Sequence, residues 1–292
     1  MYRGLQAVAA PTNIVGRTEG YRPLQNSMDV EFAYISDVGR VRQDNEDFLG
    51  HVAPATPEEV RSRGWLFAVA DGVGGHDLGE VASHTAVDSV LAGFREASPG
   101  EPHAALLERL LKDANTRVVD AGHAASPVGA RMATTFTACA LRYDRATIAH
   151  VGDSRCYLIR RGQANLLTRD HTVANEQIRL GIVSSSSAAG ANTRHLLVRS
   201  LGAELFVHVD VQEHQVLAGD ILLLCSDGLH GSITGSEMAA VTGHGGDLAT
   251  AAKRLVEIAN QRDGGDNITL QIVRVRSVER VGMYRGRPYR LR

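Results

Sequence analysis

Short, nearly all-apolar runs that stop at an acidic residue are the most constraining feature of this 292-residue chain. Runs of this kind are typical of strands buried inside a sheet. Two further acidic sites come directly before apolar segments, so the acids border buried strands at five places. In chain order these sites are Glu46 and Asp47 before residues 48–52, Asp71 after 67–70, Asp153 after 148–151, Asp227 after 222–225, and Asp266 before 268–275.

One aspartate followed by glycine is ordinary turn chemistry, but five acidic sites beside buried strands are not. If they converge at one sheet edge, their carboxylates repel one another and lose hydration, and bound cations would relieve both costs. An all-oxygen ligand set favours Mg²⁺ or Mn²⁺, whereas zinc prefers His and Cys, and the 12 histidines show no paired ligand spacing. Gly72, which follows Asp71, has no Cβ and lets its carbonyl turn toward a metal. Two such ions can activate a shared water and clamp a phosphoryl group, which indicates a hydrolase.

The remaining pattern predicts one domain in which sheets are covered by helix pairs. Each predicted helix has one apolar stripe and one polar face, as helices that cover a single sheet face do. No internal repeat and no interdomain linker is visible. The helices are expected at 82–94, 106–118 and 247–261, and the strands at 30–35, 48–52, 65–70, 133–141, 147–151, 156–160, 206–211, 220–225 and 268–275.

Three segments lack a regular pattern. Residues 1–28 are expected to be a flexible leader before a domain at 29–276, and residues 171–200, rich in Ser, Ala and Gly, a surface flap within it. The segment 274–292 contains seven arginines, and its last part, 277–292, is expected to be a solvated, disordered tail. Docking of this tail to an acidic partner is the alternative.

Composition excludes several classes of function. The balance of 33 acidic against 31 basic residues provides no global field to attract nucleic acid. No apolar run approaches the roughly 20 residues of a membrane span, and the N-terminal region lacks a signal-peptide core, so a cytoplasmic protein is expected. The three cysteines, Cys139, Cys156 and Cys225, are widely spaced in strand-like segments and are expected to be buried thiols rather than disulfide or zinc ligands.

With these residues in view, the chain resembles the bacterial metal-dependent protein phosphatases, the PPM or type 2C serine/threonine phosphatase family. The resemblance covers roughly residues 30–275. It is carried by a series of motifs in family order: GRVRQDNED at 39–47, VADGVGGH at 69–76, GEVAS at 79–83, MATT at 132–135, GDSR at 152–155, LTRDH at 167–171, RSLG at 199–202, SDGL at 226–229 and DNIT at 266–269.

The resemblance implies an α+β fold, an α-β-β-α sandwich whose two central antiparallel sheets are flanked by helix pairs. It also implies hydrolysis of phosphoserine and phosphothreonine in proteins by a metal-activated water at a binuclear Mn²⁺ or Mg²⁺ centre. By motif position Asp71 would bridge the two ions, Asp227 and Asp266 would complete the first, and the Gly72 carbonyl would serve the second.

Four further roles follow from the same resemblance. Glu46 and Asp47 would hold metal-bound waters, and Asp153 with Asp227 would form a weaker site for a third ion. Arg42 would grip the substrate phosphate, because its planar fork matches two phosphate oxygens. The implied catalytic residues are thus Arg42, Asp71 and Asp227. The implied partners are phosphorylated Ser/Thr proteins and a cognate Ser/Thr kinase, with the phosphatase acting as a monomer.

The chain departs from the family pattern in three places. Val73 stands where some eukaryotic relatives carry a histidine proposed as general acid, so the general acid is left unassigned. Ala133 replaces a glycine of the family motif, and the flap has no carboxylate between Glu176 and Glu204 to serve as a metal ligand.

Two alternative functions match parts of the sequence. Cys139 and Arg145 have the Cys-x5-Arg spacing of thiol-based phosphatases, but the segment between them has no glycine to aim N–H groups at a phosphate. A phosphatase fold that binds a kinase or phosphoprotein without turnover is the stronger alternative. Intact Asp71, Asp227 and Asp266 favour an active enzyme.

Overall fold

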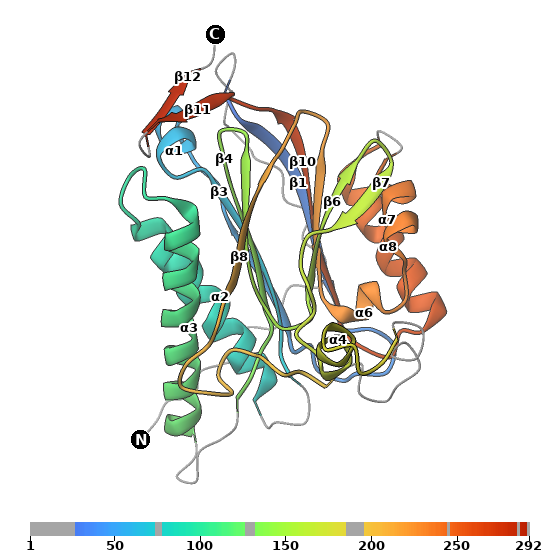
Figure 1. Ribbon diagram of the computed structural model, residues 1–292. Coiled ribbons are helices and arrows are strands. Elements are labelled where there is room, and N and C mark those ends of the chain that lie inside the picture. The colour runs from blue at the N-terminus through green and yellow to red at the C-terminus, as the bar shows by residue number, and fades with distance from the viewer. Residues whose placement is uncertain are drawn as a thin grey trace.

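Two five-stranded antiparallel sheets form the centre of the molecule (Figure 1). The computed structural model describes residues 27–73, 78–125, 132–184, 196–243, 246–284 and 287–290. Most of the expected leader, residues 74–76 of the second motif and the middle of the expected flap at 185–195 lie outside these ranges. Within them, no helix is both long and apolar enough to cross a membrane.

Each sheet combines strands from distant parts of the chain. The first sheet has the order β1 (Asp29–Asp37), β10 (Ile268–Ser277), β9 (Ile221–Cys225), β6 (Arg155–Arg160) and β7 (Gln163–Leu166). The second sheet has the order β2 (Asp47–Val52), β3 (Trp65–Asp71), β4 (Phe136–Arg142), β5 (Arg145–Val151) and β8 (Asp210–Gln215).

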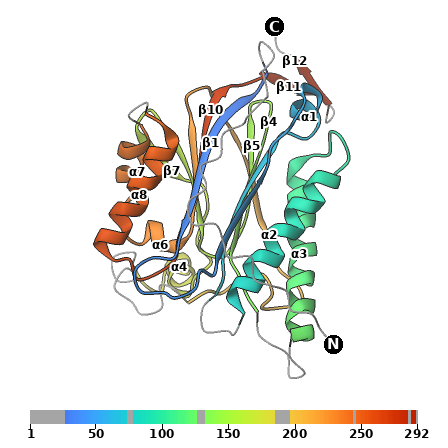
Figure 2. The ribbon, with the colours of Figure 1, turned by 180° about the vertical axis from the view of Figure 1, so that it is seen from behind.

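Helix pairs cover the outer faces of both sheets (Figure 2). The long helices α2 (Gly79–Glu96) and α3 (His103–Ala125) cover the second sheet, and α7 (Gly235–Thr242) and α8 (Leu248–Arg262) cover the first. Local signals start these helices: Thr234 and Glu237 form a capping box on α7, and Asp247 caps α8. The expected α-β-β-α sandwich is confirmed.

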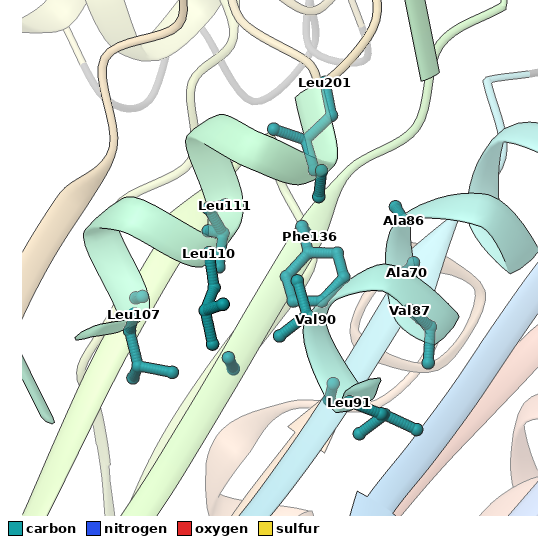
Figure 3. Close-up of a cluster of buried hydrophobic side chains, with 14 of the residues drawn as sticks. Ala70, Ala86, Val87, Val90, Leu91, Leu107, Leu110, Leu111, Phe136 and Leu201 are labelled. Atoms are coloured by element: carbon teal, nitrogen blue, oxygen red, sulfur yellow. The ribbon is translucent and has the colours of Figure 1, made fainter. Parts of the chain in front are cut away.

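Three apolar layers hold the sandwich together. Between the second sheet and its helices, the ring of Phe136 lies beside Val90 of α2 (Figure 3). Between the sheets, Phe32 and Phe67 meet edge to face with ring centroids 5.2 Å apart. A third cluster joins the first sheet to α7 and α8. Each fully buried large side chain contributes about 1.5–3 kcal/mol to the free energy of folding. These layers therefore fix the relative positions of the sheets and of the strand ends.

Two sequence expectations were wrong. The strand expected at 206–211 is β8 at Asp210–Gln215, four residues later, and Phe206 is 89% exposed. Part of the arginine-rich segment expected to be disordered forms a hairpin of β11 (Val281–Tyr284) and β12 (Arg287–Arg290). The chain before this hairpin is anchored by Glu279, which is 6% exposed and accepts a hydrogen bond from Nε of Arg61 at 2.9 Å.

Five elements were not predicted, besides the hairpin and the displaced strand. These are α1 (Pro57–Ser62), β7, α4 (Val173–Arg179), which begins the expected flap, α6 (Asp227–His230) and α7, and each is too short for periodicity to reveal. The one-turn helix α6 starts at one of the expected metal ligands. In Figure 1, α4 and α6 lie at one end of the sandwich, while α1 and the β11–β12 hairpin lie at the other.

Candidate metal centre

Asp71, the last residue of β3, is surrounded by the other expected aspartates. Burial raises the pKa of its carboxyl well above the ordinary value, and the charges of Asp47, Asp227, Asp153 and Asp266 raise the pKa further. Asp47 is paired with Asp71 in the register of β2 and β3. The structure therefore gathers at one end of the sandwich the acids that the sequence distributes over more than 200 residues.

The backbone of Asp71 is held by two threonines that precede β4. Its N–H donates to Oγ1 of Thr135 at 3.0 Å, and its carbonyl accepts from Oγ1 of Thr134 at 2.9 Å and from the N–H of Thr135 at 2.8 Å. Both threonines are buried. They fix the direction in which the strand presents the Asp71 carboxylate.

Gly72 lies where no side chain fits. Its N–H donates to the carbonyl of Glu46 at 3.0 Å. A Cβ on Gly72 would lie 2.4 Å from the carbonyl oxygen of Gly79 and 2.7 Å from that of Glu46. Glycine here is therefore a packing requirement that keeps three backbone segments together beside Asp71.

Asp47 is 2% exposed and only half satisfied. Oγ of Ser226 donates to its Oδ2 at 2.7 Å, whereas its Oδ1 has no hydrogen-bond partner among the described residues. Burial raises the pKa of Asp47 to about 7, against the opposing hydrogen bond from Ser226, and the charges of Asp227 and Asp266 contribute to the increase. An orphaned oxygen next to several acids is a group that a cation or its water would satisfy.

Arg42 and Asp266 form a two-point ion pair. Nε of Arg42 lies 2.9 Å from Oδ1 of Asp266, and its Nη2 donates to Oδ2 at 3.1 Å. Glu46 is close to the same guanidinium, with 3.8 Å between Oε2 and Nη1. Asn267 joins these segments, because its Oδ1 accepts from the N–H of Glu46 at 2.8 Å. The expected phosphate ligand thus lies beside two expected metal-site acids.

Asp153 lies in the loop between β5 and β6 and is 6% exposed. Its carbonyl accepts a hydrogen bond from Nε2 of His230 at 3.0 Å. His230 ends the single turn of α6 that Asp227 begins. The two acids expected to share a third ion are therefore linked through one short helix.

The donor set suits a hard divalent cation. Within the described ranges, no group of three or more His, Cys, Asp and Glu side chains is already arranged to hold a metal ion. Two of the acids have other partners instead: Asp266 is paired with Arg42, and Asp47 accepts a hydrogen bond from Ser226. The acids nevertheless provide only oxygen donors, and the charges of its neighbours raise the pKa of Asp71. In addition, Oδ1 of Asp47 has no hydrogen-bond partner among the described residues. These properties fit Mg²⁺ or Mn²⁺, which favour carboxylate, carbonyl and water oxygens.

Several supporting residues were not assigned a role from the sequence. Each lies within three positions of an expected acid or in one of the family motifs. This proximity was the only feature of the sequence that could have indicated their roles. The residues are Thr134, Thr135, Ser226, His230 and Asn267.

Comparisons with known proteins identify the family of this chain. The family model of protein phosphatase 2C matches residues 43–263. A serine/threonine phosphatase, stp, from Listeria innocua is 33% identical over 263 residues, covering 89% of this chain and 99% of that protein.

Solved structures give the same result. The serine/threonine phosphatase of S. agalactiae superposes with a TM-score of 0.77 at 30% identity, covering 85% of this chain and 100% of that one. The catalytic domain of the phosphatase PstP, solved in complex with two manganese ions, gives a TM-score of 0.73 at 30% identity, covering 86% and 100% of the two chains. With the family model matching more than half of its length, this chain belongs to the protein phosphatase 2C family.

Proposed function

We propose that the acid-lined end of the sandwich is the catalytic metal site at which this protein hydrolyses phosphoserine and phosphothreonine in other proteins. The chain is a metal-dependent protein serine/threonine phosphatase, as its family and its relatives indicate. One observation supports the location best: the pKa of Asp71 is raised by burial and by four neighbouring aspartates, a cost that divalent cations would offset.

Within this site we assign Asp71 as the ligand shared by two ions. Asp227 and Asp266 would complete the coordination of one ion, and the carbonyl of Gly72 would serve the other. The bound cations would supply Lewis-acid chemistry, lowering the pKa of water and neutralising charge on the phosphoryl group. The chain's own contribution is to fix these ligands, through Thr134 and Thr135 behind Asp71 and Ser226 before Asp227.

Arg42 is assigned to bind the substrate phosphate. Its side chain is 41% exposed and lies directly beside Asp266, so it is at once accessible and next to the acids. A guanidinium presents two parallel N–H donors to two oxygens, a geometry that phosphate and carboxylate share. The contact with Asp266 therefore supports the proposal that the donors of Arg42 can orient a phosphate group.

Three acids are assigned to the periphery of the site. Glu46 and Asp47 would hold waters around the ions, and Asp153 with Asp227 would hold a third, more weakly bound ion. Asp47 is buried and its Oδ1 has no partner among the residues that the structure describes, which supports a water-mediated role, since a water bridge would satisfy that oxygen.

The identity of the ions, the substrates and the location in the cell are also part of the proposal. We assign two Mn²⁺ or Mg²⁺ ions, a choice supported by the PstP structure with two manganese ions. The substrates would be the targets of a cognate Ser/Thr kinase. The protein would work as a monomer in the cytoplasm.

Metal dependence and the D227A variant test the proposal directly. Turnover of p-nitrophenyl phosphate and of a phosphothreonine peptide should require Mn²⁺ or Mg²⁺, stop in EDTA and return with excess metal. D227A should be inactive while keeping the wild-type circular dichroism spectrum. D113A, which removes an exposed acid of α3, is the matched control and should be fully active. Unchanged turnover in EDTA or in D227A would refute the assignment.

A further inference from the structure

Two histidines from different segments contact the backbone around Asp153. The N–H of Gly152 donates to Nδ1 of His171 at 3.1 Å, and the N–H of His171 donates back to the carbonyl of Gly152 at 2.7 Å. On the other side, Nε2 of His230 donates to the carbonyl of Asp153 at 3.0 Å. The peptide unit after Asp153 is thus held by the imidazole of His230. On the other side, the backbone N–H of His171 holds the carbonyl of Gly152, and the His171 imidazole holds the N–H of the same glycine.

The partners determine which ring nitrogen carries the proton. Nδ1 of His171 accepts from Gly152, so the proton is on Nε2, which donates to Oδ2 of Asp210 at 3.1 Å. Asp210 is itself held by Nη1 of Arg199 at 3.0 Å on its other oxygen. Nε2 of His230 faces a carbonyl, which can only accept, so it is protonated too. His171 is therefore neutral, and the hydrogen bonds orient both rings.

The loop around Asp153 needs external support because its backbone is unusual. Gly152 has a φ of +109°, a conformation that other residues rarely adopt, and a Cβ there would lie 2.6 Å from Cβ of Thr135. After Asp153, Oγ of Ser154 is hydrogen-bonded to Oγ1 of Thr135 at 2.6 Å. Asp153 is therefore flanked by two fixed residues, Gly152 being held by His171, and its own carbonyl is held by His230.

Both histidines lie on segments that matter for the site. His230 is on the same turn of helix as Asp227, so one element carries both that acid and the contact to Asp153. His171 stands at the start of the expected flap, and its carbonyl accepts from the N–H of Val198 on the returning side at 2.8 Å. A shift of either segment would move the Asp153 loop.

We propose that His171 and His230 are positioning residues that set the affinity of the ion shared by Asp153 and Asp227, by fixing the backbone on both sides of Asp153. The inference rests on the proposed function, which assigns Asp153 to that ion. Residues that orient metal ligands typically change metal affinity by about 10- to 100-fold when they are replaced.

Paired variants separate the hydrogen bonds of His171. H171N keeps an oxygen close to the place of Nδ1, able to accept from Gly152, and loses the contact with Asp210. H171Q keeps an amide close to the place of Nε2, able to donate to Asp210, and loses the acceptor for Gly152. For His230, H230Q keeps a donor toward the Asp153 carbonyl and H230L removes it.

The readout is Mn²⁺ binding rather than turnover. Electron paramagnetic resonance of free Mn²⁺ during titration gives the number of ions and the affinity of the weakest one. We expect H171Q and H230L to weaken that ion about tenfold or more while the tighter ions stay unchanged, and H171N and H230Q to remain within a few fold of wild type. H103L is the matched control, because His103 is a buried histidine bonded to the carbonyl of Arg63. It should lower the melting temperature without changing Mn²⁺ binding.

The D153N variant tests separately whether Asp153 is a metal ligand and whether the two histidines position it. If D153N binds every Mn²⁺ ion as wild type does, Asp153 is not a ligand and the proposed role of Asp153 is refuted. If D153N loses the weakest ion but H171Q and H230L keep wild-type affinity, the positioning role is overturned. Should H230L fail to fold, equal affinity of H171Q and H171N for the weakest ion overturns it as well.

Discussion

The guanidinium of Arg42 contacts the carboxylate of Asp266 through two donors, with Nε 2.9 Å from Oδ1 and Nη2 3.1 Å from Oδ2. The two residues are 224 positions apart in the chain and meet only because β1 and β10 are neighbours in the first sheet. Only arginine has the planar fork that this contact requires, since the lysine ammonium is a point charge without fixed donor directions.

The first prediction concerns R42K, which keeps the charge and removes the fork. Because the same two donors are assigned to phosphate, kcat/KM for a phosphothreonine peptide should fall about tenfold or more, mainly through KM, and inhibition by inorganic phosphate should weaken in parallel. Steady-state kinetics with and without phosphate measure both effects. R254K, on an exposed pair with Glu257, is the control and should match wild type. Equal phosphate inhibition in R42K and wild type would exclude the assigned role.

The second prediction is that D71N separates stability from activity. Phosphatase activity should fall on the order of 10²-fold or more, because a shared metal ligand is lost. In EDTA, D71N should nevertheless be more stable than wild type by on the order of 1 kcal/mol. The pKa of this carboxyl is higher in the folded protein than in the unfolded chain. As the pH rises above the ordinary carboxyl pKa, the unfolded chain therefore releases this proton more readily, and the wild type loses stability. Urea unfolding at pH 5 and pH 8 tests this, and a less stable D71N at both pH values would contradict it.

A third prediction follows from the space around Gly72. In G72A the new methyl group would meet the carbonyls of Gly79 and Glu46 at 2.4 and 2.7 Å, and backbone atoms cannot yield as a flexible side chain can. The variant should therefore lose Mn²⁺ affinity and at least about 1 kcal/mol of unfolding free energy. Isothermal titration and urea unfolding measure these changes. G246A adds the same methyl group where no atom of the described ranges lies within 4 Å, and it should behave as wild type.

The fourth prediction uses His103, which lies outside the acid cluster. Burial lowers its pKa to about 4, with the charge of Arg142 adding to the effect, so the folded protein keeps this ring neutral. Between about pH 6.5 and 4 the unfolded chain binds a proton that the folded chain does not, and stability is lost as the pH falls through that window. This histidine should account for about 2 kcal/mol between pH 7 and pH 5. H103Q keeps a donor for the carbonyl of Arg63 but cannot titrate. The unfolding free energy of H103Q should fall less steeply over that range, and parallel pH curves would contradict the assignment.

Local pattern located most of the secondary structure. The helices at α2, α3 and α8 and the strands from β1 to β6 were predicted at nearly their observed positions, since their apolar residues repeat with a clear period. The error at β8 has a physical cause. This strand lies at the edge of the second sheet and none of its six residues is fully buried, so its composition carries little signal, whereas the nearby exposed Phe206 looked like a core residue.

The acidic residues proposed for the site could also be named from the sequence, because each borders a buried strand and lies in a family motif. Their supporting contacts could not be. His171 and His230 come from segments far apart in the chain, and nothing in either segment alone indicates that both rings reach the loop around Asp153. The hairpin of β11 and β12 was missed for a similar reason, since its preceding segment is anchored by a contact between Glu279 and Arg61, 218 positions away.

The sequence by itself thus determined the family, the sandwich and the acidic residues that we propose as oxygen donors, because these depend on residue type, periodicity and order along the chain. Only the tertiary structure decided which charges meet. Packing of the two sheets brings Asp47, Asp71, Asp153, Asp227 and Asp266 close enough for their charges to raise the pKa of Asp71. Electrostatic energy depends on distance and burial, and neither quantity is defined until the strands have packed.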